Sequence, residues 1–129
     1  MPRWLLATVA TVLMTGEFVS AHHAYADFDR ARAVTIDGVL EELVYGNPHV
    51  MLKIRSASGV FIATWESANV VLRRANFTAT TFHVGDRLLV TGSPAREAAR
   101  HELALLTEVV RPSDGWKWSK PRPSSAPAN

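Results

Sequence analysis

The sequence predicts an all-β domain, built as one small antiparallel barrel of five to six strands. Segments rich in β-branched and apolar residues recur along the chain and are separated by turns of Gly, Pro, Asn and Ser. These segments come as three strands, one short helix and two more strands within about ninety residues, which is the order of the OB-fold. We therefore expect an OB-like barrel with one short helix between strands 3 and 4. A plain antiparallel sandwich is the alternative.

The first strand is predicted over residues 33–45, because its apolar residues at even positions fall on one face. Gly38 lies inside this strand and favours the bend that closes a small barrel. Residues 46–48 form a turn, and a second strand follows over residues 50–55. The predicted core residues of these two strands are Val34, Ile36, Leu40, Val44, Val50, Leu52 and Ile54.

The third strand is predicted over residues 60–66, after a hairpin turn at 56–59. Its nearly continuous apolar sequence suggests burial on both faces. A short helix is expected over 67–76, with Ser67 as N-cap and Val71 and Leu72 facing the core. Arg73 and Arg74 fall in its last turn, where the helix dipole favours cations.

The fourth strand is predicted over residues 87–91 and is ended by Gly-Ser-Pro at 92–94. Residues 97–100 are expected as a loop, and a fifth strand covers 103–111. Trp116 and Trp118 stand at strand spacing and indicate a sixth, edge strand. The Pro- and Ser-rich tail at 119–129 is expected to be disordered.

The first 21 residues have the pattern of a secretory signal peptide. A positive start precedes an apolar run at 4–14, which is too short to span a bilayer. Small residues at Val19 and Ala21 predict cleavage after Ala21. The mature domain would then cover residues 22–118, and we expect a bacterial periplasmic or secreted protein without a membrane span. A buried first helix is the alternative.

Composition removes several classes of function. The chain has no Cys, which excludes thiolate nucleophiles, disulfides, iron–sulfur clusters and Cys-ligated zinc. A net charge of +2 and the absence of aromatic residues among the basic ones argue against a nucleic-acid partner. No serine-hydrolase elbow, zinc-protease motif or phosphate loop is present. We therefore expect a protein that is not an enzyme.

The mature N-terminus is the candidate metal site. After cleavage, His22 would carry a free α-amine and an imidazole, two nitrogen ligands that suit Cu(II). A third nitrogen could come from His23, His49 or His83, and His49 is the best placed because it follows the Asn47–Pro48 turn. The alternatives are a flexible end at His22 and His23, a turn-stabilising hydrogen bond for His49, and a plain loop residue for His83.

A second candidate site is a ligand or partner face at the end of the third strand. Trp65 and Glu66 could offer an aromatic platform and a polar group on the barrel, with Arg73 and Arg74 nearby. The alternatives are that Trp65 belongs to the core and that Glu66 forms an ion pair with Arg73 or Arg74.

The chain resembles a family of small exported bacterial proteins, the domain of unknown function 6152. Six short features over most of the mature chain carry the resemblance. They are a His-His pair, Phe-Asp, Asn-Pro-His, Trp-Glu, and Leu-Arg-Arg followed by Gly-Asp, at His22–His23, Phe28–Asp29, Asn47–His49, Trp65–Glu66, Leu72–Arg74 and Gly85–Asp86. The resemblance implies an exported OB-like barrel. It supplies no activity, ligand or catalytic residue.

The sequence thus predicts an exported, non-enzymatic OB-like binding protein, with one copper ion bound through His22 and His49 as the leading hypothesis. The competing hypothesis is a metal-free accessory module that binds a periplasmic protein or a small ligand near Trp65, or at the edge near Trp116 and Trp118. A third class, a copper-dependent oxidase, would share the same metal ligands.

Overall fold

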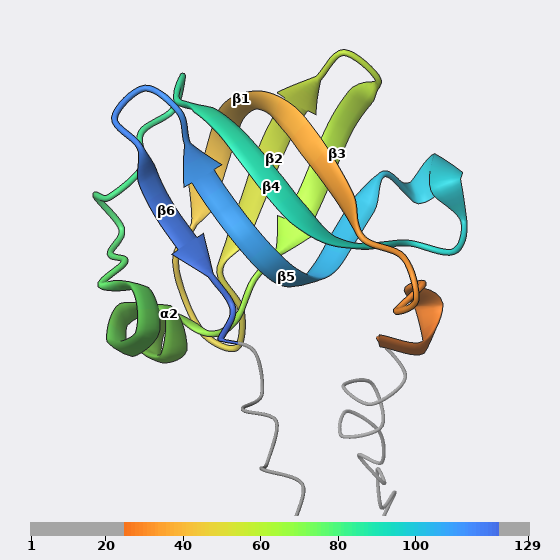
Figure 1. Ribbon diagram of the computed structural model, residues 1–129, viewed down its shortest axis with the longest axis horizontal. Helices are drawn as coiled ribbons and strands as arrows, with labels where there is room; N and C mark the ends of the chain where they lie inside the picture. The colour runs from red at the N-terminus through yellow and green to blue at the C-terminus, as the bar shows by residue number, and fades with distance from the viewer. Residues whose placement is uncertain (1–24, 122–129) are drawn as a thin grey trace, which may run out of the picture.

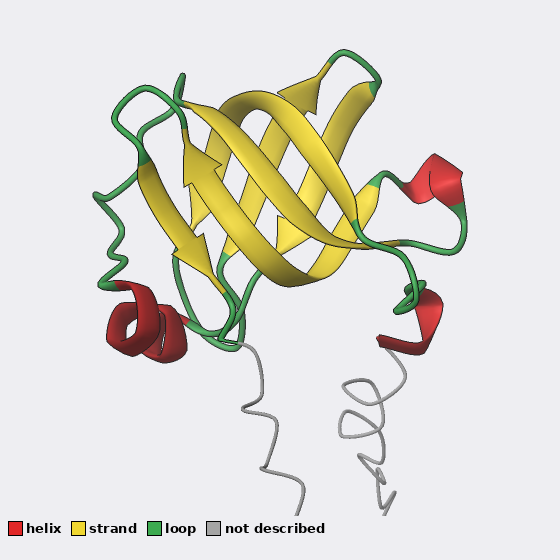
Figure 2. Ribbon diagram, viewed as in Figure 1, coloured by secondary structure: helices red, strands yellow, loops and turns green. Residues whose placement is uncertain are grey.

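The computed structural model describes residues 25–121, which form a β-barrel with short helices at its ends (Figures 1 and 2). The strands are β1 (Val34–Val44), β2 (Met51–Ser56), β3 (Gly59–Thr64), β4 (Arg87–Pro94), β5 (Glu102–Arg111) and β6 (Trp116–Ser119). The helices are η1 (Tyr25–Asp27), α2 (Ala68–Ala75) and η2 (Ala98–Arg100).

The strands form one sheet in the order β3-β2-β1-β4-β5-β6, with antiparallel neighbours throughout. A short parallel pairing of β3 with β5, at Ile62–Glu102 and Ala63–Leu103, closes five of these strands into a barrel. β6 extends the sheet beyond β5, and α2 lies between β3 and β4 in the chain. The predicted all-β class, strand number and helix position are confirmed, because this is the OB topology.

The core fills the inside of the barrel and extends under α2. On β2 the predicted alternation holds, since Leu52 and Ile54 are buried and Met51 and Arg55 are exposed. Four aromatic rings occupy the end of the core beneath α2, and their centroids lie 4.8 to 5.0 Å apart in successive contacts. These rings are Trp65, Phe77, Phe82 and Trp118, with Trp116 at their margin.

The prediction that the even-numbered apolar residues of β1 all face the core is wrong beyond Leu40. The pairing with β2 runs from Leu40–Ile54 directly to Glu42–Lys53, so Glu41 is an extra residue, a β-bulge. A bulge reverses which residues point inward, and Val44 therefore faces solvent while Leu43 packs on the core. Gly38 lies where β2 comes closest to β1, because an added Cβ there would be only 2.7 Å from Ile54 Cγ2.

Three further expectations are corrected. β3 is not buried on both faces: Val60 and Ile62 lie on its outer side and are exposed. Leu72 is 44% exposed, because the buried face of α2 consists of Ala68 and Val71, three positions apart, and Leu72 lies beside that face. β4 does not end at Thr91, since Gly92 still pairs with Val34 on β1.

The ends of α2 match the sequence prediction. Ser67 is the N-cap, and its side chain accepts a hydrogen bond from the backbone N–H of Val70. Asn76 takes the left-handed conformation at the C-cap, and Arg73 and Arg74 lie in the last turn. Residues 97–100, expected as a loop, contain the short helix η2.

No helix in residues 25–121 is long and apolar enough to cross a membrane. The predicted signal peptide at 1–21, the histidines at 22 and 23, and the tail from residue 122 onward lie outside the described residues.

Candidate functional site

His49 lies in the loop between β1 and β2, directly after a cis Asn47–Pro48 peptide bond. Its Nδ1 is 3.1 Å from the backbone carbonyl oxygen of Trp65. A carbonyl oxygen only accepts hydrogen bonds, so Nδ1 is the donor, and in the neutral ring the free lone pair is the one on Nε2. This hydrogen bond agrees with the turn-stabilising role and is also the arrangement that orients a metal-binding imidazole.

Backbone hydrogen bonds hold the loop of His49 against the segment that joins β3 to α2. Val50 donates to Glu66 at 2.9 Å, Trp65 donates to Val50 at 2.8 Å, and Ala68 donates to Gly46 at 2.9 Å. The imidazole is therefore positioned by two chain segments that belong to the closed barrel, rather than by a free loop.

A small cavity of about 70 Å³ adjoins the same segment. It brings together four parts of the chain: η1, the end of β3, β5 and the residue after β6. Leu105 on its wall has a φ of 51°, a conformation that a non-glycine residue adopts only when its surroundings force it. The lining residues are Tyr25, Thr64, Trp65, Glu66, Leu105, Leu106 and Lys120.

Tyr25 on the cavity wall is close in the sequence to the candidate metal ligand His22. It is the first described residue and follows His22 by three positions. It lies beside Trp65, whose carbonyl oxygen is within hydrogen-bond distance of His49, so Tyr25 and His49 lie at the same end of the barrel. Sequence analysis did not single out Tyr25, Leu105 or Lys120, because no local pattern shows that they meet across the barrel.

Glu66 lies on the cavity wall, and its carboxylate forms an ion pair with Arg74 at 3.2 Å. This outcome was one of the alternatives for Glu66. Arg74 is half exposed, so the ion pair contributes little to stability. Arg73 is exposed on α2. Glu66 and Arg74, two of the four predicted face residues, therefore neutralise each other's charge.

Trp65 is not a surface platform. It is 2% exposed and packs in the core against Phe77 and Trp118, with ring centroids 5.0 Å away in both cases. Within residues 25–121 its indole N–H has no hydrogen-bond partner. Trp118 is also buried, so the edge near β6 offers no exposed aromatic pair.

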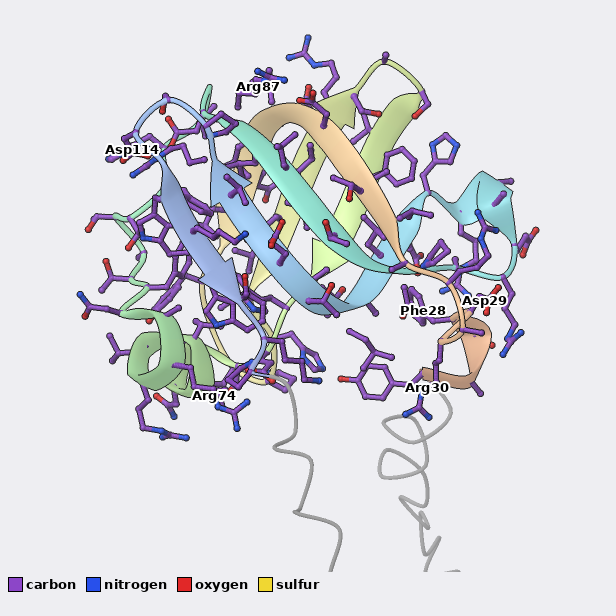
Figure 3. The ribbon with its side chains drawn as sticks, viewed as in Figure 1. Phe28, Asp29, Arg30, Arg74, Arg87 and Asp114 are labelled. Atoms are coloured by element: carbon purple, nitrogen blue, oxygen red, sulfur yellow. The ribbon has the colours of Figure 1, made fainter. Side chains whose placement is uncertain are left out.

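His83 lies at the opposite end of the barrel from His49. Its backbone N–H donates to the Asp86 carboxylate at 2.9 Å, and Arg111 bridges Asp86 and Asp114 at 3.0 and 2.8 Å. Figure 3 shows Asp114 and Arg87 at one end of the barrel, with Arg74 and Arg30 at the other. Arg74 pairs with Glu66, the neighbour of Trp65, and so marks the end of the barrel where His49 lies. The structure therefore does not bring His83 to His49.

Hydrogen bonds at this second end lower the pKa of two carboxyl groups. The pKa of Asp86 is lowered chiefly by the backbone N–H of His83 and further by Arg111. The pKa of Asp114 is lowered chiefly by the side chain of Arg111. This network ties the segment before β4 to the β5–β6 turn and is structural.

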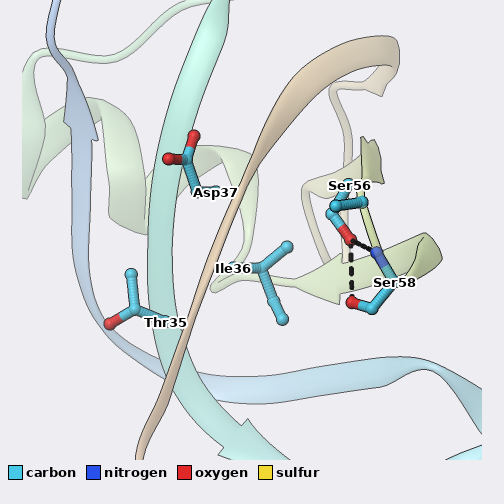
Figure 4. Close-up of a pocket in the computed structure, with 6 residues that line it drawn as sticks. Thr35, Ile36, Asp37, Ser56 and Ser58 are labelled. Atoms are coloured by element: carbon cyan, nitrogen blue, oxygen red, sulfur yellow. Dashed lines mark hydrogen bonds between the residues drawn. The ribbon is translucent and has the colours of Figure 1, made fainter.

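Two other features carry no ligand chemistry. His101 stacks on Phe61 with centroids 4.8 Å apart, next to η2. A surface hollow of about 290 Å³ between β1 and the β2–β3 turn is lined by Thr35, Ile36, Asp37 and residues 56–58 (Figure 4). The serines there bond to one another and Asp37 pairs with Arg87 at 2.7 Å, so these polar groups are satisfied.

Among residues 25–121, no three His, Asp or Glu side chains are grouped so as to hold a metal ion. A metal site that uses His49 therefore needs ligands from outside this range, and the candidates His22 and His23 lie there.

The profile of a family of unknown function, DUF6152, matches residues 10–104 of the chain. The protein belongs to this family, as the sequence resemblance indicated. Searches of curated proteins and of solved structures give no match.

Proposed function

We propose that the protein is exported and binds one copper ion through the α-amine and imidazole of His22 and the imidazole of His49. The observation that carries the proposal is the orientation of His49. Its Nδ1 donates to the Trp65 carbonyl, which in the neutral ring leaves the Nε2 lone pair for a ligand. Tyr25 lies on a cavity wall beside the same Trp65.

The distance along the chain supports the joint use of the two histidines. Tyr25 follows His22 by three positions, and an extended chain of that length spans about 10 Å. Tyr25 shares the cavity wall with Trp65, whose carbonyl oxygen fixes the His49 ring. A ligand on residue 22 can therefore reach the side of the barrel on which His49 lies.

The donor set favours copper by its chemistry. One amine and two imidazole nitrogens suit Cu(II), and copper lies at the top of the affinity order for divalent first-row metals. His23 is the adjacent source of a further nitrogen. His83 is left out of the proposed set, because its hydrogen bond to Asp86, which Arg111 links to Asp114, ties it to the β5–β6 turn.

The proposal requires export, because the α-amine of His22 exists only after cleavage behind Ala21. This gives a test that changes no side chain. Protein purified from the periplasm of a bacterial host, with its N-terminus determined by mass spectrometry, is titrated with Cu(II) and followed by electron paramagnetic resonance. We expect one equivalent bound with a nitrogen-rich axial spectrum, and loss of that spectrum when one Ala is inserted before His22.

The matched variants separate ligation from turn stability. His49→Asn keeps an N–H that can donate to the Trp65 carbonyl but lacks Nε2, so it should fold normally and weaken copper binding at least tenfold. His101→Ala serves as control, since His101 stacks on Phe61 beside η2, away from the segment that holds His49. Weak binding that is insensitive to His49→Asn refutes the copper site and favours the metal-free interaction module.

A further inference from the structure

The outer surface of β1, β2 and β3 carries an exposed apolar patch. Five of the eight large hydrophobic residues exposed within residues 25–121 lie on it, each 36 to 41% exposed. The strand registers place them in three rows across the strands, on the side opposite the core. We call this surface the outer patch: Val39, Val44, Met51, Val60 and Ile62.

The bulge at Glu41 creates part of this patch. It turns Val44 outward, next to Met51, its cross-strand partner on β2. A groove of about 310 Å³ lies here between Val44, Met51 and Ile62, with Glu42 and Lys53 on its walls. Clustered apolar side chains on a soluble surface mark an interaction site more often than scattered ones do.

Two opposite charges lie in the middle row of the outer patch. Glu42 on β1 is paired in register with Lys53 on β2, and Ile62 follows on β3. Eight ion pairs occur among the described residues, and neither Glu42 nor Lys53 takes part in one. Nearby Arg55, by contrast, is bonded to Glu41 at 2.6 Å. Both groups of the middle row are therefore free to pair with another molecule.

This arrangement is self-complementary. Two molecules can be related by a two-fold axis that lies in their interface and runs parallel to the strands, midway between β1 and β2. This axis lays β1 of each molecule across β2 of the other. It places Glu42 opposite the partner's Lys53 and Val44 opposite the partner's Met51, and each contact occurs twice, as a two-fold interface demands. We propose that the outer patch binds a second copy of this chain through this arrangement.

The balance of charge favours a second copy over other partners. The patch carries Glu42 and Lys53 in its middle row and Arg55, paired with Glu41, between Val39 and Val60. These two acidic and two basic groups give no net charge, whereas a nucleic acid or an anionic membrane needs a surplus of positive charge. The three strands make the patch only about 10 Å wide at their usual spacing. It can form the core of a small interface, so we expect a concentration-dependent dimer with a dissociation constant in the micromolar range or weaker.

Sedimentation equilibrium of the full protein as purified from the periplasm, between 5 µM and 500 µM, tests the proposal. Lys53→Glu and Glu42→Lys each place like charges in contact across the axis and should raise the dissociation constant at least tenfold. The double variant restores both attractions and should return it to within threefold of the wild type. Lys117→Glu on β6 is the matched control, because Lys117 is exposed but lies outside the patch.

Met51→Glu tests the apolar contact in the same assay and should also abolish the dimer. Circular dichroism melting of every variant shows that the barrel remains folded. A wild type that stays monomeric up to 500 µM overturns the proposal, and so does a dimer that survives Met51→Glu. Failure of the double variant to restore association overturns the two-fold arrangement. None of these results bears on copper binding, because the patch contains neither His22 nor His49.

Discussion

Gly38→Ala probes how closely β1 is bent against β2, on which closure of the barrel depends. A Cβ at position 38 would lie 2.7 Å from Ile54 Cγ2 and 2.8 Å from the Arg55 carbonyl carbon, and nearer still to the Arg55 oxygen. Ordinary contacts between such atoms are about 3.5 Å or longer. β1 cannot retreat, because it is hydrogen-bonded to β2 on one side and to β4 on the other.

Overpacking of this kind costs about 1–3 kcal/mol, and occasionally more. The obstacle is the backbone of Arg55 on β2, which is paired with β1 on one side and β3 on the other. We therefore expect a loss of about 3 kcal/mol in the free energy of unfolding. For a domain of this size that corresponds to roughly 10–20 °C in Tm. Thermal melting and urea denaturation followed by circular dichroism measure both quantities.

Gly46→Ala is the matched control for Gly38→Ala. A Cβ at Gly46 meets no atom within 4 Å, so its stability should remain within about 0.5 kcal/mol of the wild type. A Gly38→Ala protein that melts within 3 °C of the wild type would refute the packing argument. So would equal losses in the two variants.

The remaining predictions concern α2 and the network at the other end of the barrel. In urea denaturation, Val71→Ala should cost about 2 kcal/mol because Val71 is 1% exposed, and Leu72→Ala less than about 0.5 because it is not in the core. Arg111→Met should lower stability at pH 7 by about 2 kcal/mol, since it strands the Asp86 carboxylate; an unchanged urea midpoint would contradict this. The lowered pKa of Asp86 stabilises the fold above about pH 4, and this contribution disappears as the pH falls through the folded-state pKa. Asp86→Asn should therefore lose less stability than the wild type between pH 6 and pH 2, measured by melting at each pH.

Much of the barrel follows from local signals in the sequence. Turn residues at 46–48, 56–59 and 112–115 separate the strands, and the alternation on β2 gives its inner face without ambiguity. The capping pattern from Ser67 to Asn76 specifies α2. The order of these elements then leaves few ways to close a small antiparallel sheet, and the OB topology is one of them.

The bulge in β1 could not be located from parity alone. Val44 continues the even-numbered apolar series of this strand, and Leu43 beside it is apolar as well. Either residue could have faced the core. The choice is made by the pairing with β2, where the extra residue Glu41 forms an ion pair with Arg55 and shifts the register. That information lies in the partner strand, so the exposed apolar surface it creates was missed.

The candidate site was predicted in part for a similar reason. The Asn47–Pro48 turn identified His49 as a fixed residue, because the signal lies within three positions of the chain. Its hydrogen-bond partner Trp65 is 16 positions away, and Tyr25 reaches the same region from η1. The misplacement of His83 has the same origin. A sequence shows which side chains can ligate, but the closed barrel decides which of them can meet.

Trp65 links the stability of the barrel to the geometry of the site. Its side chain belongs to the aromatic core under α2, and its carbonyl oxygen orients the imidazole of His49. The backbone at position 65 is held further by the hydrogen bond from its N–H to Val50. The position of the imidazole therefore depends on the packing of a core residue rather than on side chains at the surface. An imidazole held in this way loses little conformational freedom on binding a ligand.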